Sequence, residues 1–233
     1  MQASLCQGFV LHRRPYRETS FLVDLLTEQW GKVRVMARGQ RNRKNGGSHL
    51  LQPFRLLQMG LAGRGELKQL RTVEAAELAY PLQGRALFSA LYLNELLTRL
   101  LQAELPVPEL FSAYRQSLVT LVKQPDELEP ILRNYELLLL NELGYAPDFQ
   151  HHANGEILVD DYYRYDEDEG FTPVAAGSNA RGLFRGQDLL AIGERHWHPD
   201  TLRAAKRLNR LALQPLLGSK PLKSRELFMT LEG

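Results

Sequence analysis

The chain has 233 residues, 44% of them hydrophobic, which is enough for two or three compact units with real cores. Its net charge is only +2, but residues 1–80 carry 13 Lys and Arg against 6 Asp and Glu, and residues 81–160 carry 5 against 11. The single cysteine, Cys6, excludes an internal disulfide and a multi-cysteine zinc site, and no apolar run is long enough to span a membrane.

Charge is distributed unevenly towards the end of the chain as well. Residues 199–233 carry 7 Lys and Arg against 3 Asp and Glu, so both ends are basic and the middle is acidic. This pattern favours a polyanion-binding surface formed by the two ends, with the acidic middle as scaffold or protein-docking surface. The N-terminus lacks a signal-peptide pattern, so we expect a soluble protein in the cytoplasm.

Five short strands are predicted in the first 80 residues. They cover residues 7–13, 19–26, 32–37, 51–61 and 67–75, with Pro53 weakening the start of the fourth. Glycine turns separate them, and strands this short and numerous make a small closed barrel. An OB-fold is the commonest such barrel that binds single strands, and an SH3-like barrel would give much the same pattern.

A basic loop follows the third predicted strand. Polar and apolar residues alternate over residues 32–37, and Gly46-Gly47 makes the next segment too flexible for a helix. Cations on such a loop suit a phosphate backbone, although a basic loop can also simply keep a sheet edge soluble. The candidate DNA-binding residues here are Lys32, Arg34, Arg38, Arg41, Arg43 and Lys44.

Helices are predicted from residue 84 onwards. Leucines at helical spacing indicate helices over residues 86–103, 109–123 and 129–143, the last closed by Gly144. Residues 157–159 and 162–165 are short strand candidates, residues 186–194 and 200–213 are helical, and residues 226–228 are a closing turn. The fold class is therefore α+β, a five-stranded OB-fold barrel followed by a mostly α-helical C-terminal region. We expect a DNA-binding domain at 1–80, a helical core at 81–150, and at 151–233 an irregular segment with basic helices that pack on that core.

A second basic surface is predicted near the C-terminus. Cations at three- and four-residue spacing share one broad helix face, and further cations follow it. The candidates are Arg203, Lys206, Arg207, Arg210, Lys220, Lys223 and Arg225.

No catalytic motif is present, since the chain lacks a GxxxxGK[ST] loop, a GxSxG elbow and an HExxH helix. The acids at 160–169, including Asp160 and Asp166, would suit a divalent-metal nuclease, but an acidic run is more often a solvated turn. We expect no enzyme activity, no cofactor and no bound metal.

Six segments resemble the RecO family of bacterial recombination mediators, in that family's order. They are Ala37-Arg38-Gly39, Leu51 to Phe54, Tyr92 to Leu97, Leu143 to Tyr145, Thr201 to Arg207 and Lys220 to Leu227. The resemblance implies binding of single- and double-stranded DNA, annealing of complementary strands coated by single-stranded-DNA-binding protein (SSB), and action with RecR in loading RecA. Some relatives carry a four-cysteine zinc motif, but residues 151–170 contain no cysteine.

The resemblance also implies a docking site for the acidic, phenylalanine-ended tail of SSB. We expect it near Arg133, Leu137 and Leu140, where an arginine would meet the terminal carboxylate beside an apolar pocket. The consecutive leucines at 137–140 are equally typical of a buried helix. The alternatives to a mediator are a protein-bridging scaffold without DNA affinity and a metal-dependent nuclease.

Overall fold

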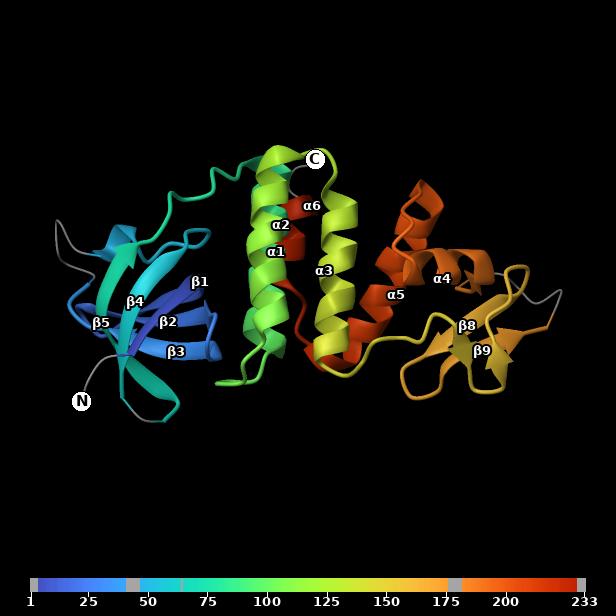
Figure 1. Ribbon diagram of the computed structural model, residues 1–233, viewed down its shortest axis with the longest axis horizontal. Coiled ribbons are helices and arrows are strands. Elements are labelled where there is room, and N and C mark those ends of the chain that lie inside the picture. The colour runs from blue at the N-terminus through green and yellow to red at the C-terminus, as the bar shows by residue number, and fades with distance from the viewer. Residues whose placement is uncertain (1–3, 41–46, 64, 176–181, 230–233) are drawn as a thin grey trace. The chain divides into compact units, whose positions relative to one another are not determined.

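The computed structural model describes residues 4–40, 47–63, 65–175 and 182–229. Its contacts divide the chain into two compact units, which Figure 1 shows in ribbon form. The first unit is Met1–Leu128 together with Pro221–Gly233, and the second is Glu129–Lys220.

Five strands form a closed barrel in the first unit. They are β1 (Ser4–Tyr16), β2 (Ser20–Thr27), β3 (Gly31–Ala37), β4 (Leu57–Ala62) and β5 (Leu67–Ala75), in the order β1-β2-β3-β5-β4. β3 and β5 are parallel, and all other neighbours are antiparallel. The predicted five-stranded OB-fold barrel is confirmed. A short 3-10 helix, η1 (Gly47–His49), precedes β4.

The barrel interior is filled by apolar side chains on alternate strand positions. Val33 and Val35 of β3 are buried, whereas Lys32 and Arg34 face outwards, as the alternation predicts. The interior also holds Cys6, Val10, Phe21, Val23, Leu25, Ala37, Leu51, Leu57, Met59 and Leu61.

The fourth strand begins later than predicted. The expectation of strand from Leu51 is wrong, because β4 starts at Leu57. Pro53 has no N–H to donate and makes only an isolated bridge with Val10. Phe54 has a φ of 64°, a left-handed conformation that interrupts an extended chain.

Three helices complete the first unit: α1 (Gly84–Leu100), α2 (Pro108–Lys123) and α6 (Lys223–Met229). Phe9 of β1 packs against Phe111 and Tyr114 of α2, with ring centroids 5.7 and 5.1 Å apart. One outer side of the barrel is therefore covered by helices.

A buried hydrogen-bond network fixes this contact. β1 has a bulge between Val10 and His12, and the Asn94 amide of α1 donates to the Leu11 carbonyl at 3.1 Å and the Val10 carbonyl at 3.5 Å. The Tyr114 hydroxyl donates to Asn94 Oδ1 at 2.5 Å. The carbonyl oxygens of Val10 and Leu11 at the bulge thus accept hydrogen bonds from a protein side chain.

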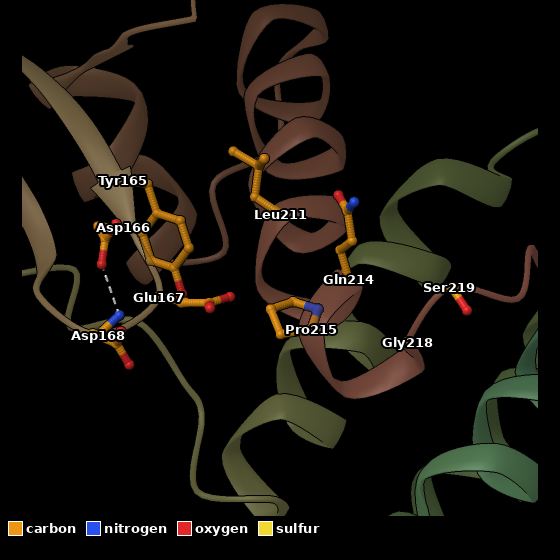
Figure 2. A pocket seen from close by; sticks show the side chains of 9 residues that line it. All are labelled: Tyr165, Asp166, Glu167, Asp168, Leu211, Gln214, Pro215, Gly218 and Ser219. Carbon is orange, nitrogen blue, oxygen red and sulfur yellow. Dashed lines mark hydrogen bonds between the residues drawn. The ribbon is translucent and has the colours of Figure 1, made fainter.

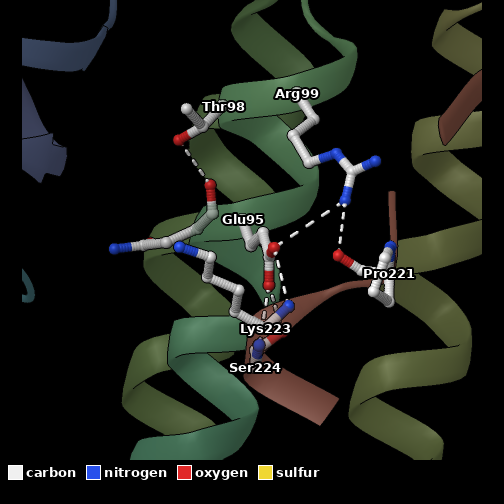
Figure 3. Close-up of polar contacts among 7 residues, drawn as sticks. Glu95, Thr98, Arg99, Pro221, Lys223 and Ser224 are labelled. Atoms are coloured by element: carbon white, nitrogen blue, oxygen red, sulfur yellow. Dashed lines mark hydrogen bonds and ion pairs between the residues drawn. The ribbon is translucent and has the colours of Figure 1, made fainter. Parts of the chain in front are cut away.

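The C-terminal segment returns to the first unit as α6, where a turn at residues 226–228 was expected; that expectation is wrong. Figure 3 shows that Glu95 of α1 receives the first N–H groups of α6. Lys223 N donates to Oε1 at 2.9 Å, and Ser224 N and Oγ donate to Oε2 at 2.8 and 2.7 Å. Arg99 donates to the Pro221 carbonyl. A carboxylate at a helix N-terminus stabilises that end, so Glu95 caps α6 from another helix.

The second unit contains three helices and short strands. The helices are α3 (Leu128–Glu142), α4 (Gly186–Gly193) and α5 (Pro199–Leu217), and the strands are β6 (His151–His152), β7 (Gly155–Glu156), β8 (Tyr162–Asp166), β9 (Gly170–Val174) and β10 (Phe184–Arg185). β8 lies between β10 and β9 in an antiparallel sheet. Gly144, with a φ of 79°, closes α3 as predicted.

Residues 157–159 do not form the strand expected there. Their backbone groups have other partners: Leu158 N donates to the Tyr163 hydroxyl at 2.7 Å, and the Val159 carbonyl accepts from Gln187 N. A loop thus connects β7 to β8, while the strand predicted over residues 162–165 is confirmed as β8.

Candidate nucleic-acid interface

The outer face of β1, β2 and β3 carries exposed arginines beyond the part that the helices of the first unit cover. Arg14 pairs in register with Leu22, which pairs with Met36, so these side chains form one row across β1, β2 and β3. In the next row Asp24 pairs with Arg34. Positions in register share a face of the sheet, so Arg14 and Arg34 lie on the same surface.

Arg34 and Lys32 have different surroundings. The Arg34 guanidinium donates to Asp24 at 2.7 Å, this hydrogen bond raises its pKa, and 53% of its side chain stays exposed. Lys32 Nζ instead donates to the Thr98 carbonyl of α1 at 2.9 Å, and burial lowers its pKa. Lys32 therefore anchors α1 to the barrel, whereas Arg34 faces solvent.

The tip of the predicted loop lies outside the described residues, since Arg41, Arg43 and Lys44 fall between the described segments. Arg38 is described and exposed, directly after β3. On the other side of the gap, the Ser48 carbonyl accepts a hydrogen bond from Arg13 at 2.7 Å. The loop therefore starts and ends beside arginines of the barrel.

Two strands of the barrel carry exposed arginines that were not predicted from the sequence, Arg14 on β1 and Arg71 on β5. The bulge in β1 shifts the alternation, and Arg71 is the extra residue where the β4–β5 register shifts. Bulges change which face a side chain occupies and leave little trace in a hydrophobic pattern.

The predicted basic face of α5 is divided by its contacts. Lys206 Nζ donates to Glu129 of α3 at 2.7 Å. Arg207 donates to the Leu183 carbonyl, and its guanidinium lies 4.1 Å from the centroid of the Phe184 ring. Arg203 pairs with Asp200, and Arg210 is exposed. The exposed cations of this helix are therefore Arg203, Arg207 and Arg210.

The remaining basic candidates lie after α5. Lys220 is the last residue of the second unit and is exposed. Lys223 and Arg225 belong to α6 and hence to the first unit, where Lys223 is exposed and Arg225 is half-buried. The predicted C-terminal surface is thus shared between the two units.

The residues expected to dock an SSB tail are all buried in the second unit. Arg133 is 4% exposed, and its guanidinium lies 3.0 Å from the buried Glu136 carboxylate. Glu136 also accepts a hydrogen bond from Asn209 of α5 at 2.8 Å. Leu137 and Leu140 are 1% and 0% exposed. A peptide carboxylate would compete with Glu136 for Arg133, and its apolar side chain would have to separate packed helices.

The acidic turn of the second unit borders a pocket of about 580 Å³. Figure 2 shows Tyr165 and the acids on one side and the end of α5 on the other. It is lined by Tyr165, Asp166, Glu167, Asp168, Leu211, Gln214, Pro215, Gly218 and Ser219. Asp166 accepts N–H groups of Asp168 and Glu169, which fixes the turn. The acids repel phosphate, so this pocket does not extend the basic surface.

The described residues contain neither a candidate metal centre nor a candidate membrane-spanning helix. No three His, Cys, Asp or Glu side chains of those residues come close enough to hold a metal ion. None of the helices described above is both long and apolar enough to cross a bilayer.

A closed OB-fold barrel followed by a mostly helical region defines the class of α+β protein to which this chain belongs. Comparison with known protein families identifies the particular family. The family model "Recombination protein O N terminal" matches residues 1–79, and "Recombination protein O C terminal" matches residues 81–226. The chain belongs to the recombination protein O (RecO) family, and this membership supports a role in DNA repair and recombination.

Similar proteins align over nearly the whole chain. The DNA repair protein RecO of Actinobacillus succinogenes is 49% identical over 225 residues, which cover 95% of this chain and 94% of that protein. The protein of the same name from Enterobacter sp. (strain 638) is 48% identical over 95% of both chains. That of Pseudoalteromonas atlantica is 46% identical over 98% of this chain and 95% of its own.

Proposed function

We propose that the protein is a recombination mediator and not an enzyme. It binds single- and double-stranded DNA, anneals complementary strands coated by SSB, and helps RecR to load RecA, in the cytoplasm at the nucleoid. The observation that carries this proposal is the exposed arginine surface of the barrel, formed by Arg14, Arg34 and Arg38. Membership of the RecO family supports the same role.

The barrel surface suits a phosphate backbone better than base edges. Arginines on a strand face neutralise phosphates and release counterions, which gives affinity without sequence preference. A protein that holds two strands by their phosphates leaves the bases free to pair, so the strands themselves supply the specificity of annealing. Arg41, Arg43 and Lys44, which lie outside the described residues, are expected to add positive charge for the same phosphates.

DNA binding is tested by a charge-matched pair of variants. Arg14→Ala with Arg38→Ala should weaken binding to single-stranded DNA and reduce the slope of log affinity against log salt by about 0.7 per lost phosphate contact. The control, Arg85→Ala with Lys123→Ala, removes two exposed cations of α1 and α2 and should change neither quantity. Equal effects of the two variants would refute a specific barrel surface.

Annealing is tested on complementary strands coated by SSB, with and without Mg²⁺. The protein should accelerate duplex formation in both conditions and cut neither strand. If it binds RecR and SSB but shows no salt-sensitive DNA affinity, it is a bridging scaffold instead.

Docking of the SSB tail at Arg133, Leu137 and Leu140 is part of the proposal and requires local opening of the second unit. A tail peptide with a free carboxylate should bind more tightly than its C-terminal amide. In the Arg133→Ala variant this preference should disappear. Because both peptides are measured on the same variant, any general loss of stability affects both affinities equally and cancels from their ratio. An unchanged preference would leave Arg133 with its structural partner Glu136 alone.

A further inference from the structure

One face of the sheet β10-β8-β9 is directed to solvent. Tyr163 of β8 is fully buried and packs in a core with Phe171 and Phe184. Successive side chains of a strand point to opposite faces, so Tyr162 and Arg164 lie on the other face. Tyr162 is 39% exposed and Arg164 is exposed as well.

Cross-strand pairing brings a second arginine to this face. Arg185 of β10 pairs in register with Tyr162, and Arg164 is two residues further along β8. Adjacent strands are about 4.8 Å apart and alternate residues of a strand about 6.7 Å apart. Both guanidinium groups can therefore reach a molecule that rests on the Tyr162 ring.

Both arginines are available for a ligand. Among the residues that the structure describes, neither Arg164 nor Arg185 has a hydrogen bond or ion pair from its side chain. The guanidinium of Arg207, in the same unit, already has partners, because it packs on the Phe184 ring and donates to a backbone carbonyl. An unpaired guanidinium presents its donors in a geometry that fits phosphate oxygens.

We propose that Tyr162, Arg164 and Arg185 form a contact for single-stranded nucleic acid, here named the Tyr162 platform. One base stacks on the tyrosine ring, and the phosphates next to it meet the two arginines. The inference rests on the proposed function, since it assigns a further contact for the same DNA. A single strand fits because its unpaired bases expose a flat face to the ring.

The acids around the platform limit its length. Asp161 precedes β8 and Asp166 ends it, and both are exposed. Their charges repel phosphates on either side of the two arginines. The Tyr162 platform therefore contacts only a short stretch of the DNA strand. Because the surrounding region is acidic overall, its net charge gives no sign of such a site.

Crosslinking and affinity test the platform on the full-length protein. A short single-stranded oligonucleotide carrying one 5-iodouracil is irradiated, and the crosslinked peptide, identified by mass spectrometry, should contain Tyr162. Tyr162→Ala should abolish this crosslink and weaken binding of the oligonucleotide about fivefold or more, whereas Tyr162→Phe retains the ring and should bind normally. The control is Tyr145→Ala, which removes a 52% exposed tyrosine of the same unit and should have no effect.

The other outcomes separate this inference from the proposed function. If binding depends on Arg14 and Arg38 but not on Tyr162, and no crosslink maps to β8, the platform is refuted and the proposed function stands. If the unaltered protein binds no oligonucleotide, both are refuted. If Tyr162→Ala abolishes RecR binding and leaves DNA binding unchanged, the face is a protein interface and the inference is wrong.

Discussion

At the scale of single residues, Asn94 and Tyr114 determine how the barrel meets its helices. The Asn94 amide donates hydrogen bonds to the two carbonyls at the β1 bulge, and the Tyr114 hydroxyl donates to the Asn94 side-chain oxygen. Both side chains are buried. Burial raises the pKa of the Tyr114 hydroxyl, so it remains a hydrogen-bond donor. The sequence did not predict these contacts, because an asparagine on a leucine-rich helix does not indicate which carbonyls it will meet.

Tyr114→Phe is expected to lower the free energy of unfolding by about 1–3 kcal/mol, because it leaves the Asn94 oxygen buried without a donor. Chemical denaturation measures the change. Tyr145→Phe removes an exposed hydroxyl and should be neutral within about 0.5 kcal/mol. A neutral Tyr114→Phe would mean that the network does not contribute to stability.

Cys6 is expected to be unreactive in the folded protein. It is 2% exposed inside the barrel, and burial raises its pKa to about 11, so at pH 8 only about one thiol in a thousand is the reactive thiolate. A thiol reagent should label the protein slowly in buffer and fully in denaturant. Rapid labelling of the native protein would show that β1 opens readily.

At the scale of elements, the regular strands and long helices were predictable and the irregular ones were not. The side chains that must be buried repeat with a fixed spacing in a regular strand or helix. This spacing is visible as alternation over residues 32–37, which form β3, and as leucine spacing over residues 86–103, most of which form α1. The bulges of β1 and β5 lie in the pairing of each strand with its neighbour along the chain, β2 and β4, and they leave little trace in the hydrophobic pattern, so Arg14 and Arg71 were not predicted. The helix α6 has seven residues, and its cap, Glu95, is 128 residues away from Lys223.

The attachment of α6 should weaken in acid. Burial opposes the charge of Glu95, but hydrogen bonds from Ser224 and Lys223 outweigh it and lower its pKa. A lowered carboxyl pKa adds stability that is complete above the unfolded value, about 4.3, and is lost as pH falls through the folded value. Hydrogen-exchange protection of the α6 amides should therefore decrease below about pH 4.3.

Glu95→Gln should remove this pH dependence, because the glutamine cannot carry the charge that Ser224 and Lys223 stabilise. Glu74→Gln, an exposed position on β5, should retain it. Protection of α6 that is independent of pH in the unaltered protein would contradict the role given to Glu95.

At the scale of the whole molecule, the strand pattern predicted the barrel, leucine spacing predicted the helical region, and the charge counts gave the two basic ends. The C-terminal cations are divided between α5 and α6, which belong to different units. An arginine beside leucines suggests a site for an anion, yet the charge of Arg133 is matched by Glu136, which is three residues further along the same helix. Whether a cation faces solvent or a buried acid depends on packing.

The two basic ends are expected to act on one DNA molecule. Replacing Arg38, Arg41, Arg43 and Lys44 by Ala should reduce the salt slope of DNA binding, and so should replacing Arg203, Arg207 and Arg210. If both ends bind the same strand, the combined variant should lose the sum of the two reductions. A combined slope equal to that of the loop variant alone would assign the binding to the barrel. Fluorescence anisotropy over a range of salt concentrations provides the measurement.

The discontinuity of the first unit has a consequence for synthesis. Its last piece, residues 221–229, leaves the ribosome after the entire second unit, and Glu95 has no α6 to cap until then. Domains generally fold in the order in which they emerge, but here the second unit can form while the first is still incomplete. A nascent chain arrested near residue 220 would expose the α1 surface that α6 covers, so chaperones should bind it until residues 221–229 emerge.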